Sequence, residues 1–239
     1  MSKRPVVLVV MDGIGISDNE FGNAVKAAYK PTLDELWGTC PHTEIKAHGL
    51  AVGLPTDGDM GNSEVGHNAL GCGQIYSQGA KLVNENIETG EIFNTDTWKD
   101  LVANCKDGKM HFLGLLSDGN VHSHINHLKA LIKRAKEDGV KEVRIHALLD
   151  GRDVPETSAL TYVDDIEAYM ADLNDDNFHA CIASGGGRMT ITMDRYEANW
   201  AMVEQGWHVH VLGEGREFAS AREAIETYRN ETGVVVQDL

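Results

Sequence analysis

The sequence lacks the features that define several large protein classes. Its four cysteines are widely spaced and form no CxxC pair, so we expect neither a disulfide framework nor a cysteine-based zinc site. No apolar run reaches membrane-spanning length, and the short run after residue 5 has no cleavage-like site, so no membrane span or signal peptide is predicted. Neither GxxxxGK[ST] nor GxGxxG occurs, which gives no support for a nucleotide loop. These absences predict a cytoplasmic protein with reduced thiols.

Positive charge is also scarce. The chain has 21 Lys and Arg against 37 Asp and Glu, which gives a net charge of -16. This balance argues against nucleic acid and anionic membranes as general partners. An acidic protein can bind an anionic substrate only through a local cluster of arginines and backbone amides.

The pattern of apolar residues predicts an α/β protein, and 239 residues can form one large domain or two smaller ones. The first part contains an apolar β-branched run that predicts a buried strand at 6–11, and further on a short helix at 32–37, a short strand at 43–47 and a helix at 63–70. From residue 110 onward strands and helices alternate, which indicates a mostly parallel sheet with right-handed crossovers. We expect strands at 111–116, 142–149, 179–183 and 207–212, and helices at 123–138, 158–173, 195–205 and 219–230, with Ser123 as an N-cap and Gly139 at a C-cap.

Polar, glycine-rich segments follow three successive predicted strands, at 117–122, 150–153 and 184–188. The carboxyl ends of parallel strands lie along one edge of the sheet, so these segments should converge at one cleft. We interpret the three glycines at 185–187 as a tight turn that places the arginine after them. The planar fork of arginine suits the binding of phosphate and carboxylate. The cleft should gather His122, Arg152, Asp153, Arg188 and Arg195.

Three histidines in this region allow a second interpretation. His122, His124 and His127 are closely spaced, but no carboxylate or cysteine cluster with metal-ligand spacing lies nearby, so a self-contained zinc site is not favoured. We interpret His122 as a phosphate contact and the other two as structural residues. Asp153 has two open interpretations, a functional carboxylate or a surface residue paired with an arginine.

Ser63 stands between a turn-forming segment and a helix-compatible run. Its hydroxyl could cap the helix, or it could act as a nucleophile, because helix amides favour a phosphate on that oxygen. Asp12 ends the first apolar run, where open α/β sheets hold ligands, although Asp-Gly is also a common turn.

Five motifs occur in one order along the chain: Asp12-Gly, Gly-Asn-Ser63-Glu-Val-Gly-His, Ser117-Asp-Gly-Asn-Val-His-Ser-His, Asp150-Gly-Arg-Asp and Ser184-Gly-Gly-Gly-Arg with Met193-Asp-Arg. Together they resemble the 2,3-bisphosphoglycerate-independent phosphoglycerate mutases, in the form of the plant and trypanosomatid branch. The resemblance covers essentially the whole chain.

The resemblance implies a two-domain enzyme that interconverts 3-phosphoglycerate and 2-phosphoglycerate through a phosphoserine, without 2,3-bisphosphoglycerate. It implies that residues 1–76 are part of an alkaline-phosphatase-like domain and residues 77–239 belong to an α/β transferase domain. Ser63 matches the phosphorylated serine, and Asp153 matches the proton carrier. The family holds two divalent metal ions, expected to be Mn²⁺, with Mg²⁺ or Co²⁺ as alternatives, and Asp12 and Ser63 match ligands of one of them. The substrate-binding set is His122, Arg152, Asp153, Arg188 and Arg195.

Members of that family are much longer, and their remaining metal ligands lie beyond residue 239. We therefore expect a truncated chain that is inactive or very weakly active alone, and a monomer when full length. Two alternatives remain open, a metal-dependent phosphatase of the alkaline-phosphatase-like class and a non-catalytic anion-binding fragment.

Overall fold

A computed structural model describes residues 4–233 of the chain, which divides into two units, Met1–Ala47 and His48–Leu239. The first unit contains the helices α1 (Ala24–Ala27) and α2 (Pro31–Thr39). The predicted helix at 32–37 is confirmed, with Pro31 at its first position. The predicted strands at 6–11 and 43–47 are wrong, and Val6 is 94% exposed. A strand needs a neighbour for its amides and carbonyls, and none of the described residues pairs with these segments.

The second unit begins with a small substructure that carries Ser63. It consists of a 3₁₀ helix, η1 (Gly49–Val52), and helix α3 (Ser63–Cys72) around a core of Val52, Leu54 and Val65. The buried Gln78 amide closes it, because Nε2 donates to the carbonyls of Val52 at 2.8 Å and Val65 at 2.9 Å. The start of α3 is therefore tied to residues that follow the helix.

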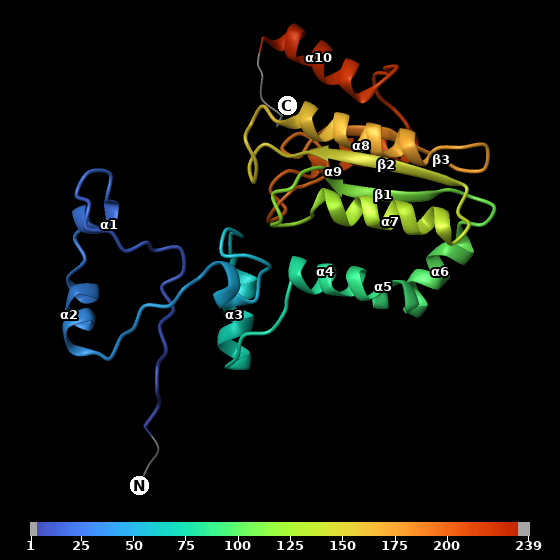
Figure 1. Cartoon of the computed structure of the whole chain (residues 1–239). Coiled ribbons are helices and arrows are strands. Elements are labelled where there is room, and N and C mark those ends of the chain that lie inside the picture. Colours follow the sequence, from blue (N-terminus) through green and yellow to red (C-terminus); the bar gives the residue numbers. More distant parts are fainter. Residues whose placement is uncertain (1–3, 234–239) are drawn as a thin grey trace. The chain divides into compact units, whose positions relative to one another are not determined.

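The centre of the second unit is a three-stranded parallel sheet in the order β1-β2-β3 (Figure 1). The strands are β1 (Met110–Leu115), β2 (Glu142–Leu149) and β3 (His179–Gly187), and the crossover helices are α7 (Ile125–Glu137) and α8 (Ala159–Leu173). Helices α4 (Ala80–Thr89), α5 (Glu91–Asn94) and α6 (Asp96–Asn104) precede the sheet. The predicted α/β class with a parallel sheet is confirmed.

The main core lies on the face of the sheet that the two crossover helices cover. Val143, Ile145 and Ala147 alternate along β2 and are almost fully buried there. Ile132 from α7 and Val163 from α8 pack in the same cluster with no exposed surface. Their burial fixes which residues of each strand face the opposite side, because side chains alternate along a strand.

The opposite face of the sheet is covered by the chain after β3. Leu115 and Leu148 form a small cluster there with Ile191. Helix α9 (Trp200–Trp207) continues directly into a π-helix, η2 (His208–Leu212), and α10 (Ala221–Thr232) follows. Among the described residues no helix is both long and apolar enough to cross a membrane.

The predicted strand at 207–212 is therefore wrong. Its alternating apolar residues suggested a strand, but a helix that has already formed extends at little cost. The predicted helix at 195–205 begins only at Trp200, because Tyr196 and Glu197 have left-handed backbones and Asn199 caps the helix.

The glycines at 185–187 do not form the predicted tight turn but continue β3 to its last residue. A Cβ on Gly185 would lie 2.8 Å from the carbonyl oxygen of Ala147 on β2. A Cβ on Gly186 would lie 2.7 Å from Ile191. These glycines are needed for close packing, and Arg188 still follows the end of the strand directly.

Two helix caps lie one residue from their predicted positions. Asn62, and not Ser63, caps α3 by accepting from the amide of Val65 at 3.0 Å. His124, and not Ser123, caps α7, because the Ser123 hydroxyl donates to the carbonyl of Leu115. Gly139 follows α7 with a φ of +90°, as predicted for a C-terminal cap.

The packing of β3 against β2 gives a testable prediction. Gly185→Ala should destabilise the protein by about 1–3 kcal/mol, because backbone atoms must shift to admit the methyl group. Gly114→Ala on β1 is the matched control, since a Cβ there meets nothing within 4 Å. Urea unfolding of both variants measures the difference, and equal stabilities would contradict this role of Gly185.

Candidate phosphate-binding site at the strand ends

Asp150, directly after β2, joins the ends of all three strands. The Ser117 hydroxyl, after β1, donates to Oδ2 of Asp150 at 2.7 Å. Nη1 of Arg188, after β3, donates to Oδ1 at 2.9 Å. The backbone amides of Arg152 and Asp153 also donate to Oδ1, each at 3.1 Å. We call Ser117, His122, Asp150, Arg152, Asp153 and Arg188 the rim cluster.

Burial makes the charges of this cluster strongly interdependent. Asp150 is only 2% exposed and Arg188 only 6%. Burial opposes ionisation of Asp150, but hydrogen bonds from Ser117, two backbone amides and Arg188 outweigh it and lower its pKa. Burial likewise opposes the charge of Arg188, but its bonds to Asp153 and Asp150 raise its pKa. Both side chains therefore remain charged over the physiological pH range.

The other rim residues surround this ion pair. Asp153 is half-buried, and its Oδ2 accepts from Nη1 of Arg188 at 2.8 Å. His122 is exposed, with Nε2 3.9 Å from the same oxygen of Asp153. Arg152 is exposed, and its Nη1 contacts Sδ of Met189 at 3.3 Å. The structure thus brings together four of the five predicted substrate-binding residues.

Arg195 is not part of this hydrogen-bonded group. It lies in the 189–199 segment between β3 and α9, and its guanidinium stacks on the ring of Tyr196 at 4.7 Å. Asp194 holds the end of the segment by accepting from the amides of Ala198 and Asn199.

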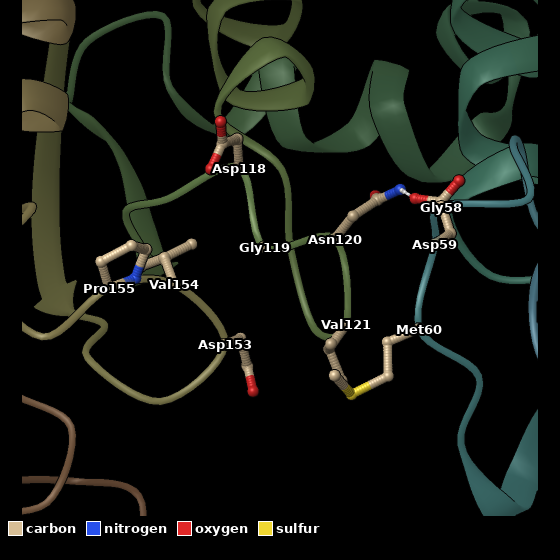
Figure 2. A pocket seen from close by; sticks show the side chains of 10 residues that line it. All are labelled: Gly58, Asp59, Met60, Asp118, Gly119, Asn120, Val121, Asp153, Val154 and Pro155. Carbon is tan, nitrogen blue, oxygen red and sulfur yellow. Dashed lines mark hydrogen bonds between the residues drawn. The ribbon is translucent and has the colours of Figure 1, made fainter.

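A cavity of about 360 Å³ lies beside the rim cluster (Figure 2). It lies between residues 58–60, 118–121 and 153–155, and Asn120 donates to Asp59 across it. The loops approach closely, since a Cβ on Gly119 would lie 2.8 Å from Cβ of Asp153. The carboxylates of Asp59, Asp118 and Asp153 line the cavity. An anion is therefore favoured at the arginines of the rim and not inside the cavity.

Ser63 is the first residue of α3 and is exposed. Its Oγ lies 3.2 Å from Nδ1 of His67, and the same nitrogen lies 2.7 Å from the carbonyl oxygen of Ser63. A carbonyl oxygen only accepts, so Nδ1 of His67 carries the proton and has no lone pair for the hydroxyl. His67 is therefore not placed to act as a general base towards Ser63.

The two predicted metal ligands lie in different units, Asp12 in an exposed turn of the first and Ser63 in the second. Within residues 4–233 no group of three or more His, Cys, Asp and Glu side chains is arranged to hold a metal ion. The donors present in this chain therefore do not by themselves form the predicted two-metal site.

His124 and His127 make structural contacts, as predicted from the sequence. His124 caps α7, and Nε2 of His127 hydrogen-bonds to Oδ1 of Asn84 on α4. Burial lowers the pKa of His127.

Sequence reasoning missed the central position of Asp150 and the link between Asp59 and Asn120. Asp150 stands in the same strand-end motif as Arg152, but the sequence pattern does not show which of its carboxylates is buried.

Comparison with known proteins identifies relatives of the whole chain. It is 55% identical over 237 residues to a probable 2,3-bisphosphoglycerate-independent phosphoglycerate mutase of Leptospira interrogans, covering 98% of this chain and 43% of the relative. It is 50% identical to the 2,3-bisphosphoglycerate-independent phosphoglycerate mutase of Trypanosoma brucei brucei, covering 97% of this chain and 42% of the relative. The chain thus spans less than half the length of these relatives.

A solved structure gives the same result. The chain is similar to crystal structures of Leishmania mexicana phosphoglycerate mutase at low cobalt concentration, with a TM-score of 0.84 and 48% identity. This match covers 96% of the chain and 42% of the solved one. The family model described as the BPG-independent PGAM N-terminus matches residues 83–236. This family model covers more than half of the residues of the chain. The chain therefore belongs to the 2,3-bisphosphoglycerate-independent phosphoglycerate mutase family.

Proposed function

We propose that this chain supplies the phosphoglycerate-binding residues and the phosphoryl-accepting serine of a mutase that interconverts 3-phosphoglycerate and 2-phosphoglycerate. The main support is the rim cluster, in which Arg188 and His122 lie against one carboxylate, Asp153, and the backbone amide of Arg152 shares the acceptor Asp150 with Arg188. The names of the relatives support the same activity.

In this proposal the arginines and His122 bind the phosphate and carboxylate groups of the substrate. Both ion pairs of Arg188 use Nη1, and a guanidinium has five N–H donors, so donors remain for an anion. Arg195 completes the set when its segment approaches the ligand.

Asp153 carries the hydroxyl proton of the substrate in the proposed reaction. In the free chain its carboxylate is paired with Arg188. An anion bound to Arg188 competes with Asp153 for the guanidinium, so the carboxylate can accept the hydroxyl proton of the substrate. The rim thereby links substrate binding to proton acceptance.

Ser63 accepts the phosphoryl group and returns it to the other hydroxyl of glycerate. His67 does not provide the base for this step, so the serine requires activation from outside the rim cluster. We propose two divalent metal ions as that activation, Mn²⁺ or alternatively Mg²⁺ or Co²⁺, with Asp12 and Ser63 as part of the ligand set. Residues 4–233 do not bring a further group of such ligands together.

The proposal retains the domain assignment of residues 1–76 to the alkaline-phosphatase-like domain and 77–239 to the transferase domain. It describes a cytoplasmic enzyme that is a monomer at full length. A metal-dependent phosphatase remains the second candidate, because the same serine could pass its phosphate to water.

The first prediction of the proposed function concerns substrate binding by the chain alone. Arg152→Met should weaken 3-phosphoglycerate binding about 10- to 100-fold, because an exposed guanidinium that contacts the anion is lost. The melting temperature should change little. Lys106→Met is the matched control, since it removes an exposed cation from the opposite end of the strands, before β1. Isothermal titration calorimetry measures both, and equal affinities for the two variants would contradict the site.

The second prediction concerns catalysis. A chimera in which this chain replaces the matching region of the Leptospira relative should convert 3-phosphoglycerate to 2-phosphoglycerate in the presence of Mn²⁺. Ser63→Ala in the chimera should lower turnover at least about 1,000-fold, because the nucleophile is lost. The 239-residue chain alone should show no turnover.

Phosphorus-31 NMR distinguishes 2-phosphoglycerate, 3-phosphoglycerate and free phosphate in this assay. Ser77→Ala is the control, since Ser77 bonds only to Glu85 and lies outside the rim cluster. Release of free phosphate without formation of 2-phosphoglycerate would contradict the mutase activity and support the phosphatase activity. Full activity of Ser63→Ala would leave that residue with a structural role only.

A further inference from the structure

A continuous chain of hydrogen bonds crosses the face of the sheet opposite to α7 and α8. Nδ1 of His111 on β1 lies 2.8 Å from Nε2 of His146 on β2, and the two rings are stacked. Oγ of Ser184 on β3 lies 2.6 Å from Nδ1 of His146 and 2.7 Å from Nδ1 of His210 on η2. Nε2 of His210 then lies 3.2 Å from Oγ1 of Thr192. We call these five residues the histidine chain.

The hydrogen-bond donors and acceptors within the histidine chain match each other. Each neutral imidazole has one donor and one acceptor, and each hydroxyl has one donor. Three arrangements therefore satisfy all four hydrogen bonds. Every donor can point towards Thr192, every donor can point towards His111, or both flanking imidazoles can donate to Ser184, whose oxygen accepts twice. Loss of the hydroxyl of Ser184 breaks the chain at its centre, because both flanking imidazoles lose a partner.

The central histidines are neutral at physiological pH. Burial lowers the pKa of His146 to about 4, with further contributions from the charges of His210 and His111. Burial also lowers the pKa of His210. A hydrogen-bonded chain of neutral groups rigidifies a half-buried surface without introducing charge into it.

Thr192, the last residue of the histidine chain, has a left-handed backbone conformation. Thr192 has a φ of +72°, which is strained for a β-branched residue. Its amide donates to the carbonyl of Met202 at 3.0 Å, and it packs so closely on Gly206 that a Cβ there would lie 2.3 Å from Oγ1. The neighbouring Ile191 is buried against β1 and β2. Thr192 thus anchors the start of the segment that carries Arg195, while Asp194 and Asn199 hold its end.

The π-helix η2 supplies one member of the histidine chain, His210. It presents His210 to Ser184 and to Thr192, and π-helical turns within α-helices are frequent at functional sites.

We propose that His146, Ser184 and His210 are positioning residues, which set the conformation of the 189–199 segment and so present Arg195 to the substrate. The proposal rests on the proposed role of Arg195 in phosphoglycerate binding. The histidine chain acts through Thr192 and does not touch the substrate itself.

The test measures segment order and substrate binding separately, on the 239-residue chain. Ser184→Ala and Thr192→Val each remove one hydroxyl with little change of shape. Hydrogen–deuterium exchange of residues 189–199 and of η2 should accelerate at least about fivefold in both variants, with α7 and α8 unchanged. Thr192→Ser keeps the hydroxyl and should exchange like the wild type. His208→Gln is the control, because His208 lies on the same π-helix but pairs with Glu214.

The second readout is 3-phosphoglycerate affinity, which should fall about threefold to tenfold in Ser184→Ala. Nitrogen-15 NMR of the wild-type imidazoles should show His146 and His210 neutral at pH 7, and Ser184→Ala should change both signals. Unchanged exchange of the 189–199 segment in Ser184→Ala would overturn the positioning role. Faster exchange with unchanged 3-phosphoglycerate affinity would also overturn it. If the wild type binds no 3-phosphoglycerate, the proposed function fails, while the exchange data still decide whether the histidine chain orders the segment.

Discussion

The ion pair between Asp150 and Arg188 is the interaction on which the site depends. It joins the end of β2 to the end of β3, and Ser117 adds the end of β1 through the same carboxylate. A buried pair of this kind contributes little net stability, but removal of one partner costs about 3–5 kcal/mol because a charge remains buried alone. The pair is therefore best understood as a device that fixes geometry. It holds Arg188 and Asp153 in place before any ligand arrives.

This arrangement supports the proposed anion-binding surface of a strongly acidic chain. Two arginines and one histidine lie at the rim, while the cavity beside them is lined by carboxylates. The carboxylates keep the arginines oriented and restrict where an anion can bind. On the face of the sheet opposite to α7 and α8, the proposed role of the histidine chain is to hold the Arg195 segment with neutral groups. The carboxyl ends of the strands and one face of the sheet thus position different parts of the proposed substrate-binding set.

The sequence predicted the parts of the fold that depend on local pattern and parallel topology. The three strands of the sheet and the convergence of residues 117, 150 and 188 follow from alternation of strands and helices, and β2 was predicted with its exact bounds. Elements that depend on tertiary partners were predicted poorly. Residues 6–11 read as a strand but have no pairing strand in the described chain, and residues 207–212 read as a strand but extend α9. The glycines of β3 look like a turn, and only the distance to Ala147 explains them.

The site shows the same division. Residue type and spacing were enough to predict that His122, Arg152, Asp153 and Arg188 lie together, because each follows the carboxyl end of a parallel strand. They could not identify Asp150 as the shared acceptor, since burial distinguishes it from Asp153 and is not visible in the motif. The histidine chain escaped prediction because its five members are spread from residue 111 to residue 210 and meet only across the folded sheet.

A crystal structure of the chain with 3-phosphoglycerate tests the central claim most directly. The account predicts that the anionic groups of the ligand lie within hydrogen-bond distance of Arg152, Arg188 and His122, with a substrate hydroxyl next to Asp153 and the Asp150–Arg188 pair intact. A ligand bound away from the strand ends, or one that leaves Arg188 without any contact to it, would contradict the account.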